Sequence, residues 1–339
     1  MMPSQRVIEN LNLGLHTLFE RHETVSLLGE DVLDPYGGAF KASKGLSTKY
    51  PDRVISTPLS EGGFVGVAAG MALCGEKPIV EIMFGDFITL AFDQIVNFAA
   101  KSVSMYGTEL SLNLVVRCPI GGNRSYGPTH SQSLQKHFLG VPNLDLFEIS
   151  QFHDNAVVLE KLVGLGRPSI LFEDKVLYTQ RMYDVGIIDE IFGFEKCGDD
   201  NDFVRVFSRD FDKPHCLLIT TGGLVPRCLS AMRELFVEHE IECEMMVPSR
   251  VYPLDLRSLE PAVAVMEHIF VVEEGTPGGS WGSEVSHNIS RNFWDQLEHP
   301  ITIIQARDSI IPSARHLEEK VLVQSGRIVN EIKSRVRHA

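Results

Sequence analysis

A glutamate at the end of an expected strand is the first residue whose type and place could do chemistry. Glu61 closes the segment of residues 52–61, which reads as a short strand ending at a turn before an apolar helix. Ligands of open parallel sheets bind beyond the carboxyl ends of the strands, so a carboxylate there can point into a cleft. The alternative is structural, because the helix dipole favours a carboxylate at a helix N-terminus. Position alone leaves both interpretations open.

A histidine beside a glycine-rich loop is the second candidate. His130 lies in PTHSQS, directly after the loop of residues 121–128, whose glycines permit close approach of a ligand. In such a polar loop, histidine is better placed for acid–base catalysis than on an apolar helix face. The alternative is a solvated loop histidine. Arg124 in the loop could bind an anionic substrate group or simply be exposed.

Carboxylates alternate with aromatic rings in the segment EIMFGDFITLAFDQIVN. The carboxylates are Glu81, Asp86 and Asp93, and the rings are Phe84, Phe87 and Phe92. Composition alone favours a structural interpretation, in which Phe84 and Phe87 belong to the core. Asp93 and Asn97 are one helical turn apart, so Asp93 and Gln94 would then be surface or capping groups.

Several familiar site patterns are missing from the sequence. It contains no GxGxxG dinucleotide loop, no GxxxxGK[ST] phosphate loop and no GxSxG nucleophile elbow. No spacing of histidine, cysteine or acidic residues predicts a metal site. The six cysteines form no CxxC pair, and several lie in apolar runs, so we expect reduced and mostly buried thiols.

The elements that must position these residues follow an alternating pattern. Expected strands at 24–31, 52–61, 77–84 and 109–119 alternate with helical segments at 6–21, from Gly62 to Gly75, and at 90–106; further strands are expected at 144–149 and 168–173. Such alternation predicts a mostly parallel sheet with helices on both faces. A polar, acidic stretch follows, and the alternation restarts at His215. We therefore expect an α/β protein with a first domain over 1–185, a linker over 186–212 and a smaller α/β domain over 213–339.

Composition narrows the class of protein further. The chain has 339 residues and a net charge of −14, so phosphate-rich partners such as nucleic acid and anionic membrane are disfavoured. The N-terminus lacks the apolar stretch of a signal peptide. No run approaches the ~20 apolar residues of a membrane helix. We expect a cytoplasmic protein that binds neither nucleic acid nor membrane.

Taken together, these segments resemble the beta subunits of thiamine-diphosphate-dependent 2-oxo acid dehydrogenases, a family that includes the pyruvate, branched-chain and acetoin enzymes. The matching stretches, in chain order, are GEDVLDPYGGAFKASKGL, RVISTPLSEGGFVGVAAGMAL, KPIVEIMFGDF, DQIVNFAAK, PTHSQS, VVEEGTPGGSWGSEV and IIPSARHLEE. The resemblance implies a transketolase-like pyrimidine-binding domain with a mostly parallel sheet, followed by a smaller transketolase C-terminal α/β domain.

The same resemblance assigns roles to four residues. Glu61 matches the carboxylate that contacts the aminopyrimidine ring of thiamine diphosphate, where it favours the tautomer able to take up a proton. Phe87 matches the aromatic residue that stacks on this ring, and Met83 matches its apolar neighbour. His130 matches a histidine of the active-site channel that handles protons or positions the acyl acceptor. Arg117 lies nearby in the motif without a defined role.

The resemblance also implies partners. The GDG motif that holds Mg²⁺ and the diphosphate is missing here, and in the family a separate alpha subunit supplies it. We therefore expect an α₂β₂ heterotetramer, with Mg²⁺ held mainly by the alpha subunit and a lipoyl-bearing acyltransferase as a further partner. The expected reaction decarboxylates a 2-oxo acid and passes the acyl group to lipoyl. The alternatives are an acyloin-forming or transketolase-like carboligase subunit and a non-catalytic scaffold for an alpha subunit.

Overall fold

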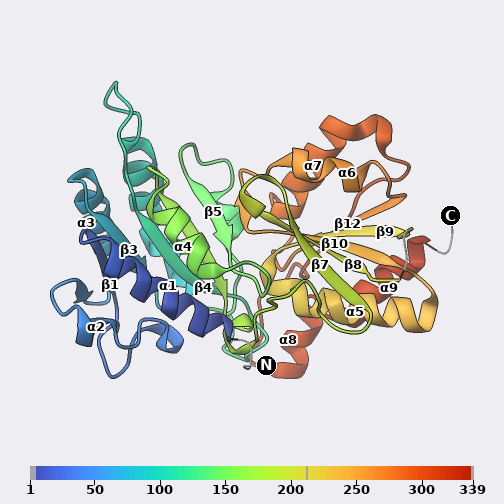
Figure 1. Cartoon of the computed structure of the whole chain (residues 1–339), viewed down its shortest axis with the longest axis horizontal. Coiled ribbons are helices and arrows are strands. Elements are labelled where there is room, and N and C mark those ends of the chain that lie inside the picture. The colour runs from blue at the N-terminus through green and yellow to red at the C-terminus, as the bar shows by residue number, and fades with distance from the viewer. Residues whose placement is uncertain (1–4, 211–212, 337–339) are drawn as a thin grey trace. The chain divides into compact units, whose positions relative to one another are not determined.

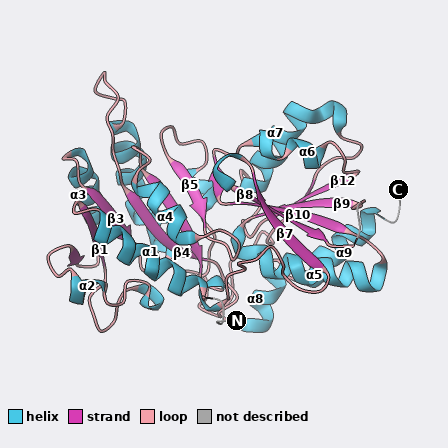
Figure 2. Ribbon diagram, in the orientation of Figure 1, coloured by secondary structure: helices cyan, strands magenta, loops and turns pink. Residues whose placement is uncertain are grey.

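The protein consists of two compact units. The structure is a computed structural model that describes residues 5–210 and 213–336. Unit 1 contains the described residues up to 121 together with 129–149 and 154–182. Unit 2 contains 122–128, 150–153 and the described residues from 183 onward. Figure 1 shows the chain coloured along its length, and Figure 2 shows it coloured by secondary structure.

Unit 1 alternates strands and helices, as the sequence predicts. Its α-helices are α1 (Val7–Arg21), α2 (Leu46–Lys49), α3 (Glu61–Leu73) and α4 (Asn155–Val163), and its strands are β1 (Val25–Gly29), β2 (Val54–Ser56), β3 (Lys77–Glu81), β4 (Val115–Ile120), β5 (Asp145–Glu148) and β6 (Ser169–Asp174). Its 3₁₀-helices are η1 (Ala39–Lys41), η2 (Gly85–Ala91), η4 (Gln135–Phe138) and η5 (Leu177–Thr179), and η3 (Gln94–Ala100) is a π-helix.

These strands form a parallel sheet with helices packed on it. Within unit 1 the strand order is β5-β6-β4-β3-β1-β2, and every neighbouring pair is parallel. Helix α1 buries Val7, Leu11, Leu15 and Leu18, one apolar stripe at helical spacing. It packs against α4, and Figure 1 shows both helices lying across one face of the sheet. Helix α3 packs against η2 and η3.

Unit 2 is a second α/β layer structure. Its strands are β7 (Phe192–Cys197), β8 (Phe203–Ser208), β9 (Cys216–Thr220), β10 (Cys243–Pro248), β11 (Arg250–Tyr252), β12 (His268–Val272) and β13 (Thr302–Ile304). Its longer helices are α5 (Val225–His239), α6 (Glu260–Val263), α7 (Trp281–Phe293), α8 (Arg315–Val321) and α9 (Ser325–Val336). Shorter turns are η6 (Asp199–Asn201), η7 (Gly222–Leu224), η8 (Leu256–Ser258) and η9 (Trp294–Gln296).

The main sheet of unit 2 runs in the order β13-β12-β9-β10-β8-β7. The first four of these strands are parallel, whereas β8 is antiparallel to both β10 and β7. One apolar core joins this sheet to α5 and α9, with Leu218, Met232, Phe270 and Ile328 among its buried members.

The expected linker over 186–212 contains two of these strands. β7 and β8 pair from Phe192↔Ser208 to Cys197↔Phe203, so the segment belongs to the sheet of unit 2 and does not merely connect domains. The acidic run that suggested a linker is the hairpin turn around η6. Elsewhere the helices are short or divided: residues 131–139 contain only η4, residues 256–266 contain η8 and α6, and the C-terminal residues contain the separate helices α8 and α9.

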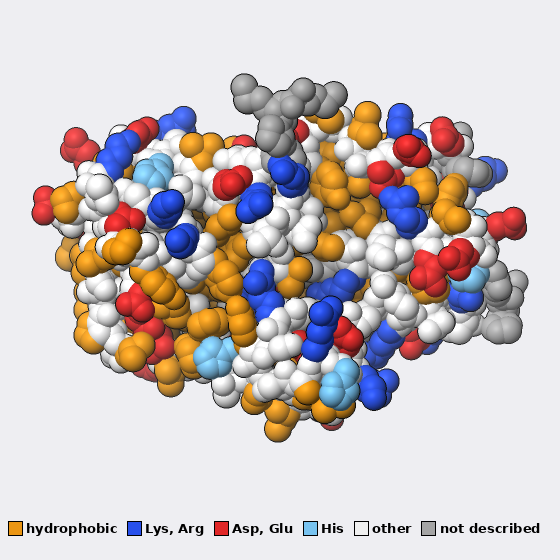
Figure 3. All heavy atoms as spheres, turned by 90° about the horizontal axis from the view of Figure 1, so that it is seen from below, with side chains coloured by type: hydrophobic (Ala, Val, Ile, Leu, Met, Phe, Trp, Pro, Cys, Tyr) orange, Lys and Arg blue, Asp and Glu red, His pale blue; other side chains and the backbone are white. Residues whose placement is uncertain are grey.

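The cysteine thiols are free and mostly buried, as the sequence predicts. All six cysteines are free; Cys118, Cys216, Cys228 and Cys243 are buried, whereas Cys74 is exposed and Cys197 half-buried. In the described part of the chain, none of the helices is both long and apolar enough to cross a membrane. On the face drawn in Figure 3, hydrophobic side chains gather over unit 1, at the left of the view, among charged ones.

Candidate active site

Two buried glutamates follow neighbouring parallel strands of unit 1. Glu30 comes directly after β1, and Glu61 is the first residue of α3, beyond the end of β2. Because β1 and β2 pair in parallel, their carboxyl ends lie at the same edge of the sheet. The two side chains are only 5% and 6% exposed, so both carboxyl groups are largely removed from water.

The surroundings of Glu30 disfavour the charged form of its carboxyl group. Burial raises the pKa of Glu30, and the neighbouring charge of Glu61 raises this pKa further. One buried oxygen of Glu30, Oε1, has no hydrogen-bond partner among the residues that the structure describes. Glu30 can therefore keep its proton to higher pH than an exposed glutamate and still offer a carboxyl oxygen to a ligand.

A cluster of three rings forms the second part of the site. The His130 ring packs edge-on against Phe84, with the ring centroids 4.7 Å apart, and against Phe87 at 5.2 Å. Both phenylalanines are half-buried, so the composition-based expectation that they belong to the core does not hold. Phe84 and Phe87 also meet each other edge-on at 6.4 Å. The cluster thus offers aromatic surface next to a titratable ring.

Hydrogen bonds hold the segments that carry His130 and the two phenylalanines. The Thr129 hydroxyl lies 3.0 Å from Nδ1 of His130 in a hydrogen bond. Asp86 lies between the two phenylalanines in the sequence, and its side chain is buried. It accepts a 2.7 Å hydrogen bond from the Gln132 side chain. These bonds tie η2 to the loop that carries His130, so the ring is held against the two phenylalanines.

Close packing of α3 on η2 connects the glutamates with the aromatic cluster. At Gly62, the residue after Glu61, an added Cβ would lie 2.9 Å from the carbonyl oxygen of Leu90, near the end of η2. Glycine therefore lets the start of α3 approach the helical turn that carries Phe87. Met83 lies between β3 and η2 and is half-buried. Its predicted contact with the cofactor ring stays a prediction.

The remaining acidic candidates have structural roles. Asp93 is exposed and accepts a 2.8 Å hydrogen bond from Asn97, which agrees with its interpretation as a surface group. The expected regular helix over 90–106 is a π-helix over Gln94–Ala100, with further helical residues on either side. Glu81 is not near water at all, since its side chain is only 1% exposed.

Glu81 instead belongs to a buried ionic network. The Arg117 guanidinium donates from Nη1 to Glu81 at 2.6 Å and from Nε and Nη2 to Glu173 at 2.7 and 2.8 Å. The second Glu81 oxygen accepts from the backbone N–H of Ala39, and the Tyr178 hydroxyl donates to Glu173, each at 2.6 Å. The network ties β3, β4 and β6 together, and it gives Arg117 a structural role.

The loop that precedes His130 belongs to unit 2 over residues 122–128. The backbone N–H groups of Asn123 and Ser125 donate to the two carboxylate oxygens of Glu318 in α8, at 2.9 and 3.0 Å. Both residues have positive φ, a conformation held by these bonds. Arg124 lies between them and is half-buried, so it is not the fully exposed side chain that one interpretation expected.

One surface group in the described part of the chain has donor atoms spaced for a metal ion. It consists of Glu234, Glu238 and His239 at the end of α5, whose ligand atoms lie within 4.8 Å of one another. Such exposed acidic groups are common on helices without any ion, and these residues are remote in sequence from the predicted site residues.

Sequence reasoning found part of this arrangement and missed the rest. It singled out Glu61, Phe87 and His130, and the structure brings the last two together. It missed Glu30, although this residue is the last but one of the expected strand over 24–31, a position similar to that of Glu61 in its own segment. It also gave Thr129 and Gln132 no role of their own, although both lie in the quoted segment PTHSQS.

Comparisons with known proteins agree in both units. Residues 5–180 match the family described as "Transketolase, pyrimidine binding domain", and residues 208–328 match "Transketolase, C-terminal domain". The mitochondrial pyruvate dehydrogenase E1 component subunit beta of Bos taurus is 31% identical over 332 residues, covering 96% of this chain and 89% of the relative. A chloroplastic subunit, beta-2 of Arabidopsis thaliana, is 29% identical over 96% of this chain and 77% of its own length.

A solved structure shares the fold. The protein titled "Split gene transketolase, inactive beta4 tetramer" superposes with a TM-score of 0.71 over 97% of both chains. Its sequence identity is 17%, so this likeness concerns the arrangement of helices and strands alone.

Proposed function

Because the chain belongs to the family of pyruvate dehydrogenase E1 component beta subunits, we propose that it contributes the pyrimidine half of an active site shared with an alpha subunit. Family membership supports a thiamine-diphosphate-dependent 2-oxo acid dehydrogenase subunit. The finer proposal is that this enzyme decarboxylates a 2-oxo acid and passes the acyl group to a lipoyl-bearing acyltransferase.

The observation that carries the proposal is the buried pair of Glu30 and Glu61. An aminopyrimidine presents ring nitrogens and an amino group, which need hydrogen-bonding partners once the ring leaves water. The orphaned Oε1 of Glu30 and the carboxyl group of Glu61 are such partners. The half-buried rings of Phe84 and Phe87 offer apolar surface for stacking. The residues present therefore fit the ring end of thiamine diphosphate.

When bound, thiamine diphosphate supplies a carbon nucleophile for the 2-oxo group and an electron sink for decarboxylation. In this proposal Glu61 hydrogen-bonds to a ring nitrogen and holds or releases a proton there. Glu30, whose charged form is disfavoured by burial and by the nearby charge of Glu61, adds a second carboxyl group that can donate a hydrogen bond beside the ring. The pair thereby sets the protonation of the ring.

His130 would act on the substrate side. Its Nδ1 is engaged by Thr129, and within residues 5–210 and 213–336 its Nε2 makes no hydrogen bond. With one ring nitrogen oriented and the other open, the imidazole can exchange a proton with a bound group or position it. The edge-on contacts with Phe84 and Phe87 hold the ring plane.

The partner requirement rests on the diphosphate end of the cofactor. The sequence contains no GDG motif, so we assign Mg²⁺ and the diphosphate mainly to an alpha subunit and propose an α₂β₂ assembly. Cofactor binding then needs both chains. The lipoyl acceptor and the acyl transfer rest on the family alone.

The test is cofactor titration with and without the partner. We expect the chain and its alpha-type subunit to co-purify and to bind thiamine diphosphate with Mg²⁺ only as a complex. That complex should then decarboxylate a 2-oxo acid and acylate a lipoyl domain. Full binding by this chain alone would contradict the shared site. Decarboxylation that delivers its product only to a second carbonyl compound would favour the carboligase alternative.

A further inference from the structure

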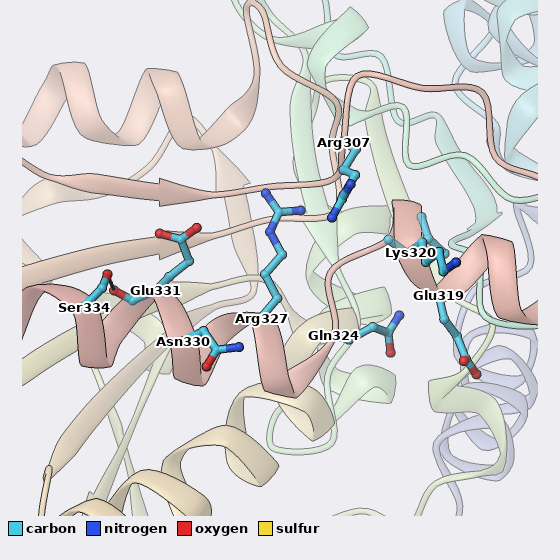
Figure 4. Close-up of a pocket in the computed structure, with 9 residues that line it drawn as sticks. Arg307, Glu319, Lys320, Gln324, Arg327, Asn330, Glu331 and Ser334 are labelled. Carbon is cyan, nitrogen blue, oxygen red and sulfur yellow. Dashed lines mark hydrogen bonds between the residues drawn. The ribbon is translucent and has the colours of Figure 1, made fainter.

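Unit 2 contains a basic cavity that the proposed reaction does not use. The cavity has a volume of about 380 Å³ and lies against α8, α9 and the segment after β13 (Figure 4). Its cationic lining residues are Arg307, Lys320 and Arg327. Asn330 and Ser334 line it from the same helix as Arg327, at positions three and seven residues further along, which is one helix face. The residues predicted to carry the reaction are absent from this lining.

The positive charge in the cavity is not balanced by its own carboxylates. Two glutamates line the cavity, but Glu319 is bonded to Arg315 at 2.9 Å, and Glu331 is bonded to Arg335 at 2.7 Å. Arg307, Lys320 and Arg327 form no ion pair with any residue that the structure describes. Although the chain has a net charge of −14, this cavity is therefore locally basic.

One buried nitrogen of the Arg327 guanidinium has no hydrogen-bond partner among the described residues. Nη1 of Arg327 is out of contact with water and has no hydrogen-bond partner in the described parts of the chain. A buried guanidinium nitrogen left without an acceptor is unfavourable, and more so beside another positive charge. An acceptor from outside the chain would remove this penalty.

The backbone holds the two arginines in place without a ligand. Figure 4 shows the guanidinium groups of Arg307 and Arg327 turned toward each other at the cavity. The N–H of Arg307 donates to the carbonyl of Val321 at 2.9 Å, and the N–H of Arg327 donates to that of Gln324 at 3.0 Å. The main chain at both arginines is therefore fixed without a ligand, and their guanidinium groups face a common space in which an anion can lie.

We propose that this cavity binds the phosphate group of a small phosphorylated metabolite. Guanidinium groups match phosphate oxygens with paired hydrogen bonds, and a phosphate dianion suits three cations better than a single carboxylate does. The amide of Asn330 lies further along α9, where it can hydrogen-bond the rest of such a molecule. The volume leaves space beyond the phosphate for a few carbon atoms.

The test is calorimetric titration of the full chain with inorganic phosphate at low ionic strength. We expect saturable binding that Arg307→Gln and Arg327→Gln each weaken by about tenfold or more, which is about 1.4 kcal/mol per factor of ten. The matched control is Arg291→Gln, which removes an exposed arginine of α7 outside the cavity. It should bind phosphate as the unaltered chain does. Thermal melting of each variant checks folding, and Arg307 is exposed, so its replacement should fold normally.

Three outcomes would overturn the proposal. The first is no saturable binding of millimolar phosphate. The second is equal weakening by Arg291→Gln, which would indicate unspecific attraction. The third is binding of succinate as tight as that of phosphate, which would assign the cavity to carboxylates. A Glu61→Gln variant should bind phosphate normally, so failure here and failure of the proposed reaction can be told apart.

Discussion

Unit 1 contains two buried groups of charged side chains, and they differ in how completely they are paired. In the network of Arg117, Glu81 and Glu173, every carboxylate oxygen accepts a short hydrogen bond. In the pair of Glu30 and Glu61, two like groups lie within electrostatic reach and one buried oxygen is left without a partner. The first group stabilises the sheet by satisfying its own charges. The second keeps a buried carboxyl oxygen free to accept a hydrogen bond, as expected of a ligand-binding site.

The largest expected effect concerns the unsatisfied pair. Replacing Glu61 by Gln keeps the shape of the side chain but removes the group that exchanges a proton with the cofactor ring. We expect kcat of the complex with the alpha subunit to fall by about 10²–10⁴-fold, the range for a general acid–base group. Steady-state assays with a 2-oxo acid measure this. Glu23→Gln, at an exposed position of the same unit, should leave kcat unchanged.

If Glu61→Gln turned over as fast as the unaltered subunit, the catalytic assignment would be wrong. The scaffold alternative would then gain support, because the chain would be needed for assembly but not for proton transfer.

The next effect concerns the buried network of Arg117, Glu81 and Glu173, and it should change the free energy of unfolding. Arg117→Leu would leave the carboxylates of Glu81 and Glu173 buried without their counter-ion. We expect the free energy of unfolding to fall by about 3–5 kcal/mol, as when one partner of a buried ion pair is removed. Denaturant unfolding followed by circular dichroism measures it. Removing the exposed arginine of the Arg21–Glu160 pair should cost at most about 1 kcal/mol. Equal losses in the two variants would mean that the buried network contributes no more to stability than an exposed ion pair does.

The sequence predicts the local features of this contrast better than the distant ones. Glu61 and His130 could be found because each lies in its own strand-end or loop pattern. Glu30 was missed because its importance depends on β1 lying next to β2, a pairing between segments that are far apart in the chain. The ionic network depends on three separate strands. A single arginine inside the apolar run of β4 was its only local signal.

The hairpin of β7 and β8 illustrates a different limit. Within β8, more and less buried residues alternate from Val204 to Ser208, the pattern of a half-buried strand. The acidic residues of the turn before it dominate the local composition, so the stretch was interpreted as a linker. Alternation after the turn indicates β8, whereas β7 has no such pattern and is recognised only from its pairing with β8.

A smaller effect should distinguish Glu30 from the ionic network through its pH dependence. The folded chain holds the Glu30 proton to higher pH than the unfolded chain, because burial and then Glu61 raise the pKa of Glu30. The resulting stability is present at low pH. It is lost as the pH rises above about 4.3, the ordinary value, and through the raised pKa. Glu30→Gln should remove this loss and give a flatter profile of unfolding free energy against pH. An unchanged profile would mean that folding does not raise the pKa of the Glu30 carboxyl group.

The smallest expected effect tests whether the ring cluster is held for function. Thr129 is exposed, so Thr129→Val should leave the melting temperature unchanged while it removes the hydrogen bond to Nδ1 of His130. One such bond is worth about 1 kcal/mol, so we expect kcat to fall about fivefold with little change in KM. Thr129→Ser keeps the hydroxyl and should restore kcat. If Thr129 acted only on the loop fold, valine would lower stability, and if it did nothing, valine and serine would behave alike. Recovery with serine alone would show that a positioned imidazole, and not merely the aromatic packing around it, is what this edge of unit 1 provides.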